Sequence, residues 1–181
     1  WDFVGIAREL RERALPGVPL VHFNGAAGNV AAGKYNDGAK ENRAILAQRL
    51  AAGLQRAWDN QRKHAVSAAD LGWEVAPVSL PVRETLAEDR LAARLKDSTL
   101  KQADRLRAGR DLTFVRRTRG GYHVPITCLQ LGPARILHLP GELFVEYQLA
   151  AQQQRPGEFV AMAAYGDYGP GYIGTAVAYT Q

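Results

Sequence analysis

Oxygen-bearing side chains near the end of the chain have a spacing that would place them in one site. Glu142 directly follows a Pro140-Gly141 turn at the end of a short apolar run, and Tyr168 and Tyr172 lie in a Gly/Tyr-rich stretch after a second apolar run. This order predicts a strand, a tight turn, a helix, a second strand and a loop. Because α/β proteins place their chemistry in loops at strand ends, we expect a carboxylate and a phenol to share one rim.

A loop of small residues, 24–33, is the second candidate element. It follows the apolar run 18–23 and contains Gly25, Gly28 and Gly33, which tolerate positive φ or the close approach of another group to the backbone. A phosphate loop is disfavoured, because neither the Lys-Ser/Thr ending nor the dinucleotide spacing is present. Two interpretations stay open: a plain connection between a strand and a helix, or a site loop whose backbone N–H groups donate to an oxyanion.

These motifs resemble the closing part of the amidase domain of the neutral/alkaline, non-lysosomal ceramidases. The sequence LPGE, an apolar run, and then YGDYGPGYIGT have the order and separation of the family's Pro-Gly-Glu turn and Tyr-x-x-Tyr-[Ile/Val]-x-Thr stretch. The resemblance implies that Glu142 and Tyr172 bind a catalytic zinc ion and that Tyr168 positions the substrate. It covers the second half of the family's catalytic domain, so two further histidine ligands are expected upstream of this chain.

The resemblance breaks at the position of the family's active-site serine. Where the family has Gly-Asp-Val-Ser-Pro-Asn, residues 28–33 read GNVAAG, so that Ala31 replaces the serine and Asn29 replaces the acid. An alanine methyl can neither attack a carbonyl nor donate a hydrogen bond, and hydrolysis would therefore use a metal-activated water. The candidate catalytic residues are Asn29 and Tyr168, and the candidate substrate-binding residues are Gly28, Ala31 and Tyr35, the last as a residue that could line a pocket after the loop.

Hydrophobic periodicity predicts an α/β fold, a mixed β-sheet flanked by helices. Strands are expected near residues 19, 73, 125, 137 and 161. Helices are expected over 2–14, 40–64, 85–110 with a break near 97–99, and 142–154, the last with Glu142 in its first turn. The basic, Gly-ended segment 116–121 predicts a hairpin. We interpret residues 1–181 as a single domain or a fragment, the C-terminal portion of a ceramidase-like catalytic domain.

The composition restricts the class of protein. With 181 residues, 46% of them hydrophobic, the chain can bury a core. The net charge of +5 comes from basic residues interleaved with acids, which is typical of solvated helix faces. No nucleic-acid-binding module accompanies this charge, so no nucleic-acid partner is expected. The single cysteine, Cys128, can form no internal disulfide and is interpreted as a small buried residue.

The location and the partners are expected from the resemblance. No apolar run approaches the roughly 20 residues that span a bilayer, and no signal peptide is visible. Most members of the family are secreted or exported, which implies an extracytoplasmic location. The family's activity implies a small-molecule or lipid amide as substrate, with peripheral contact to a membrane.

Two other functions stay open. The alanine at position 31 favours a ceramidase-like fold that has lost catalysis and serves as a binding or structural module. The second is a hydrolase without a metal, for which His22 beside the glycine loop is the candidate base, although no acidic residue that would orient it lies nearby. His64 is interpreted as solvated and His123 and His138 as structural, because metal sites need several convergent ligands.

Overall fold

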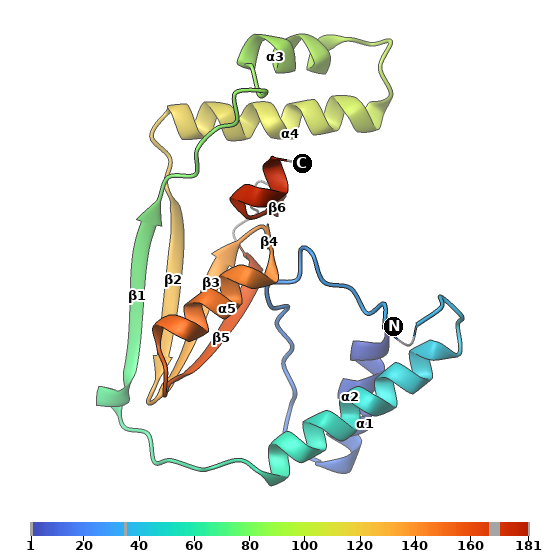
Figure 1. Cartoon of the computed structure of the whole chain (residues 1–181), viewed down its shortest axis with the longest axis vertical. Helices are drawn as coiled ribbons and strands as arrows, with labels where there is room; N and C mark the ends of the chain where they lie inside the picture. Colours follow the sequence, from blue (N-terminus) through green and yellow to red (C-terminus); the bar gives the residue numbers. More distant parts are fainter. Residues whose placement is uncertain (1, 35, 167–170, 181) are drawn as a thin grey trace. The chain divides into compact units, whose positions relative to one another are not determined.

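A computed structural model describes residues 2–34, 36–166 and 171–180 (Figure 1). The chain divides into two compact units. One unit comprises Trp1–Phe23 and Val30–Ser67, and the other comprises Asn24–Asn29 and Ala68–Gln181. Residues 24–29 of the loop of small residues therefore belong to the second unit, and residues 30–33 belong to the first.

The first unit is a pair of packed helices, α1 (Phe3–Ala14) and α2 (Asn42–Asp59). Helix α1 begins at Asp2, whose Oδ1 accepts a hydrogen bond from the backbone N–H of Phe3 at 2.7 Å, and the chain turns away at Gly17 with φ of 86°. Each helix buries one alanine completely, at positions 7 and 47. Both helices confirm the predicted amphipathic segments, with α2 about five residues shorter at its end.

The second unit is built on a four-stranded mixed sheet. Its strands are β1 (Leu71–Val78), β2 (Val124–Leu131), β3 (Ala134–Pro140) and β5 (Phe159–Gly166), in the order β1-β2-β3-β5. The first two pairings are antiparallel and β3 pairs with β5 in parallel, which requires a crossover. Helix α5 (Val145–Gln154) makes this crossover and packs along β5 (Figure 1). The predicted α/β class, a mixed sheet flanked by helices, is confirmed.

The described residues of this unit also form two short strands and two short 3-10 helices. The strands β4 (Glu142–Leu143) and β6 (Tyr172–Ile173) pair in parallel with each other. The 3-10 helices are η1 (Ala68–Asp70), before β1, and η2 (Ala176–Tyr179), after β6. No helix in the described part of the chain is long and apolar enough to cross a membrane.

Helices α3 (Glu88–Lys96) and α4 (Gln102–Arg119) form an antiparallel hairpin. The buried residues that they share are Leu91, Ala108, Leu112 and Val115. The predicted break between them is confirmed, because the Asp97 carboxylate accepts from both the backbone N–H and the hydroxyl of Thr99, at 2.9 and 2.6 Å. Asp97 thus ends α3 and starts the turn.

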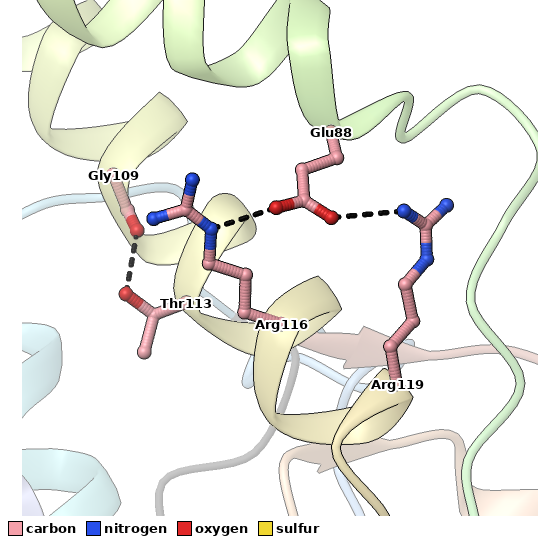
Figure 2. A network of polar contacts seen from close by, with 5 residues as sticks. All are labelled: Glu88, Gly109, Thr113, Arg116 and Arg119. Atoms are coloured by element: carbon pink, nitrogen blue, oxygen red, sulfur yellow. Dashed lines mark hydrogen bonds and ion pairs between the residues drawn. The ribbon is translucent and has the colours of Figure 1, made fainter.

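The predicted end of the second helix at residue 110 is wrong, and so is the hairpin at 116–121. Helix α4 continues to Arg119 and ends at Gly120, followed by Gly121 with φ of 84°. Arg116 and Arg119 both contact the Glu88 carboxylate of α3, at 2.8 and 2.9 Å (Figure 2). Basic residues are favourable in the last turn of a helix, and here Glu88 pairs with two of them. The same run of arginines is therefore compatible with a helix end, although in the sequence it resembles a turn.

The predicted strand near residue 19 is also wrong. Segment 18–23 has no regular secondary structure, and Val21 and Phe23 are 71% and 61% exposed. The backbone N–H of Leu20 donates to the Glu12 carboxylate at 3.0 Å instead of to a neighbouring strand. An apolar run becomes a strand only where a sheet edge accepts its hydrogen bonds.

Candidate functional site

The Pro-Gly-Glu turn leaves the sheet at the end of β3. Gly141 has φ of 69°, and a Cβ placed there would lie 2.7 Å from the carbonyl oxygen of Gly171. Only glycine fits such a close approach in this backbone conformation. The register of β3 against β5 shifts between His138 and Pro140, so the strand departs from the sheet at the turn.

Glu142 and Tyr172 are direct register partners in the parallel pair of β4 and β6. The backbone N–H of Glu142 donates to the carbonyl of Gly171 at 2.8 Å, and that of Phe144 donates to Ile173 at 3.1 Å. Register partners point to the same face of a sheet, so the carboxylate and the phenol lie side by side. Glu142 is half-buried and Tyr172 is 59% exposed, which leaves the pair open to solvent.

The structure thus brings together the two residues that the resemblance assigns to zinc, although their role as metal ligands stays a prediction. One detail of the sequence interpretation is wrong. Glu142 lies on β4 and not in the first turn of a helix, because α5 begins only at Val145. The parallel partner strand β6, thirty residues away in the sequence, takes up the backbone hydrogen bonds that a helix would have made internally.

Tyr165 belongs to the same cluster and was missed by the sequence analysis. It lies at the end of β5, and its backbone N–H donates to the carbonyl of Gly141 at 3.0 Å. Partial burial raises the pKa of the Tyr165 phenol, and the Glu142 carboxylate and Tyr172 raise it further. In the sequence, Tyr165 is the first residue of the Gly/Tyr-rich stretch, and no local pattern marks it as a neighbour of Glu142.

Asn29 holds the start of α5 from the loop of small residues. Its Oδ1 accepts from the backbone N–H of Val145 at 2.9 Å, and its Nδ2 donates to the two carboxylate oxygens of Glu146 at 2.9 and 3.2 Å. The first contact caps the helix from a position 116 residues earlier in the chain. This geometry positions α5; a catalytic role for Asn29 stays a prediction.

The glycines of this loop let it approach β4 and α5. A Cβ at Gly28 would lie 2.5 Å from the carbonyl oxygen of Glu142, and one at Gly25 would lie 2.8 Å from Oε1 of Gln148. The backbone N–H of Gly28 donates to Leu143 at 2.8 Å and that of Ala26 donates to Gln148 at 3.2 Å. Both N–H groups are therefore used within the fold, and donation to an oxyanion by other N–H groups of the loop stays a prediction.

Three residues of the predicted site lie outside the described part of the second unit. Ala31 is exposed and belongs to the first unit, whereas Gly28 and Asn29 belong to the second. Tyr35 and Tyr168 lie outside the described residues. A place for Ala31, Tyr35 and Tyr168 beside Glu142 stays a prediction.

The histidines of the sheet have structural partners, as the sequence analysis expected. Nδ1 of His123 lies 2.7 Å from the hydroxyl of Ser79, and Nδ1 of His138 lies 3.2 Å from that of Thr127. The His138 ring also packs at 5.3 Å from the Trp73 ring. Among residues 2–34, 36–166 and 171–180 there is no cluster of three or more His, Cys, Asp or Glu side chains that would hold a metal ion.

Comparison with known proteins gives one relationship, at the level of the fold. Neither a protein-family model nor a curated protein sequence matches this chain. The crystal structure of neutral ceramidase from Pseudomonas aeruginosa matches with a TM-score of 0.56 and 16% sequence identity, over 95% of this chain and 34% of that one. The chain therefore has a ceramidase-like fold and spans about a third of the ceramidase.

Proposed function

We propose that the protein is a zinc-dependent hydrolase of the neutral ceramidase type that cleaves an N-acyl amide bond with a metal-activated water. The observation that carries this proposal is the pairing of Glu142 with Tyr172 on β4 and β6, in a fold that resembles a ceramidase. Both residues offer an oxygen donor that solvent can reach, and backbone hydrogen bonds fix the two strands that carry them. They would supply two of the ligands of a zinc site.

The donor set is compatible with zinc but incomplete. Zinc accepts carboxylate oxygen, and a catalytic zinc usually takes three protein ligands and keeps one position for water or substrate. Glu142 supplies a carboxylate and Tyr172 a phenol at the adjacent register position. With the two histidines expected upstream of this chain, the set would have four protein ligands, one more than is usual, and a water would be the fifth ligand. These two residues therefore fit zinc as part of a ligand set, not as the whole of it.

The residues of this chain would bind the metal and orient the substrate. When bound, zinc lowers the pKa of its water toward neutrality and polarises a carbonyl. The backbone that carries the Glu142 side chain is fixed by hydrogen bonds, from its own N–H to the carbonyl of Gly171 and from the N–H of Gly28 to the carbonyl of Leu143. A fixed backbone would limit the positions open to the Glu142 carboxylate and so help to orient a bound metal and substrate, and orientation supplies much of the rate enhancement of enzymes.

The substrate class and the location belong to the proposal. The expected substrate is a small-molecule or lipid amide, delivered with peripheral contact to a membrane, in an extracytoplasmic compartment. These points rest on the resemblance of the sequence motifs to the ceramidase family. The sequence identity of 16% leaves room for a substrate other than ceramide.

A second candidate is a catalytically inactive binding module with the same fold. The observation that favours it is Ala31, which stands where the family resemblance places a serine hydroxyl. A binding module could keep Glu142 and Tyr172 as metal ligands and still lack hydrolysis. Zinc content alone therefore does not separate the two functions.

The experiment measures both zinc and hydrolysis in the intact protein. We expect stoichiometric zinc by elemental analysis and turnover of N-acyl amides of varied chain length. Glu142→Gln should lose the metal and lower the rate by roughly 100-fold or more, because it removes a charged ligand. The matched control is Glu74→Gln, an exposed strand carboxylate on β1, which should change neither. Zinc without hydrolysis would favour the binding module, and protein without zinc would contradict the metallohydrolase.

A further inference from the structure

Tyr165 has a backbone conformation that a tyrosine rarely adopts. Its φ is 64°, and it is the one residue other than glycine with positive φ in the described part of the chain. For a bulky side chain this value is an outlier that costs free energy, and such outliers gather at functional sites. The conformation therefore calls for a compensating role.

Packing does not supply this role. The Tyr165 side chain is 42% exposed, so it fills no core position. The backbone requirement is only that an N–H be available for the carbonyl of Gly141, and glycine or asparagine would provide it with less strain. What distinguishes tyrosine from these residues is its phenol.

The surroundings show where the phenol acts. The backbone bond to Gly141 fixes Tyr165 against the turn that carries Glu142. Glu142 and Tyr172 both interact electrostatically with the Tyr165 phenol. The three oxygen-bearing side chains thus come from the ends of β5, β4 and β6, which are adjacent through backbone hydrogen bonds.

We propose that Tyr165 is a substrate-positioning residue whose strained backbone presents the phenol O–H as a hydrogen-bond donor to the acyl oxygen of a ligand held at Glu142 and Tyr172. This inference rests on the proposed amide hydrolysis for the identity of the ligand. Tyr165 is not a metal ligand in this arrangement. A neutral phenol beside a carboxylate is a donor, and a donor aimed at a carbonyl gains strength as negative charge develops on that oxygen.

The first test measures stability and needs no activity. Tyr165→Gly should change the thermal unfolding midpoint by less than roughly 2 °C, because relief of the strain offsets the extra backbone entropy that glycine loses on folding. Tyr165→Phe keeps the strain and should leave the midpoint unchanged. A midpoint lower by more than about 5 °C for Tyr165→Gly would show that the side chain stabilises the fold, and it would overturn the inference whatever the enzyme assays give.

The second test separates positioning from metal binding in the intact protein. Tyr165→Phe should retain full zinc, lower kcat for N-acyl amides roughly tenfold or more, and change KM much less. The matched control is Tyr122→Phe, which removes another partly exposed phenol and should change none of these values. Loss of zinc in Tyr165→Phe, or a kcat within twofold of the unmodified protein, would overturn the inference.

The two tests also distinguish this inference from the proposed function. An unmodified protein that contains zinc but hydrolyses no amide contradicts the proposed function and, with it, the acyl oxygen as the partner of Tyr165. The other outcome is an unmodified protein that hydrolyses amides and a Tyr165→Phe variant with the same zinc content, kcat and KM as the control Tyr122→Phe. In that case the proposed function stands and the role of Tyr165 fails.

Discussion

The helical hairpin of α3 and α4 and the turn that carries Glu142 are held together in opposite ways. The hairpin is continuous in the sequence and is joined by side chains: a small apolar cluster and the exposed contacts of Glu88 with Arg116 and Arg119 (Figure 2). The turn is joined by backbone groups from segments more than a hundred residues apart, and glycines make the approach possible. We therefore expect single substitutions to be far more damaging at the turn than in the hairpin.

The largest expected effect is that of Gly28→Ala. The new methyl would lie 2.5 Å from the Glu142 carbonyl oxygen, and this neighbour is backbone, which cannot rotate away. Relieving the clash requires the loop to separate from β4, and we expect a loss of about 3 kcal/mol in the free energy of unfolding. Chemical denaturation of the two proteins measures this difference.

The control for this prediction lies in the same loop. A Cβ at Gly33 meets no atom within 4 Å, and its φ is not in the positive region. Gly33→Ala should change the free energy of unfolding by less than about 0.5 kcal/mol. Equal effects at positions 28 and 33 would show that the close backbone approach does not limit the fold.

An intermediate effect is expected for Asn29→Asp. The amide of Asn29 donates to the Glu146 carboxylate, and an aspartate in its place would bring two negative charges together while still capping α5. We expect a loss of about 1 kcal/mol, limited by solvent screening because the contact is exposed.

The double variant Asn29→Asp/Glu146→Gln tests the cause. It restores a donor and an acceptor with the roles exchanged, so most of the lost stability should return. A double variant no more stable than Asn29→Asp would mean that the charge of Glu146 is not involved. This pairing also gives a physical reason for asparagine where the ceramidase resemblance has an acid: the acid is on the helix instead.

The same contrast explains what the sequence could predict. The sequence predicts the two helices α3 and α4 and the break between them, because hydrophobic periodicity and the turn signal at Asp97 are local features of the sequence. The strands β1, β2, β3 and β5 were predicted for the same reason. The extent of α4 was missed because its last turn depends on Glu88, 28 and 31 residues earlier.

The site was predicted only as far as the family resemblance reached. The resemblance selected Glu142 and Tyr172, which β4 and β6 bring together. Periodicity did not predict β4 or β6, since a two-residue strand has no period. The contact of Gly28 with Leu143 and the φ of Tyr165 follow from pairings across the fold, which no local pattern encodes.

The smallest expected effect is that of Glu88→Gln in the hairpin. The hydrogen bond from Arg116 lowers the pKa of the Glu88 carboxyl below its ordinary value of 4.5; burial opposes this shift, and Arg119 adds to it. A carboxyl with a lowered folded-state pKa stabilises the fold above its unfolded-state pKa and loses that contribution as the pH falls through the folded-state value.

At pH 7 the midpoint of thermal unfolding of Glu88→Gln should be roughly 1–2 °C below that of the unmodified protein, and salt should reduce the difference. The difference should shrink as the pH falls below 4.5 and vanish only below the lowered folded-state pKa of Glu88. Glu84→Gln, an exposed carboxyl without an ion pair in the described part of the chain, should show no difference at either pH. A difference that persists in acid would show that the glutamate acts through packing and not through its charge.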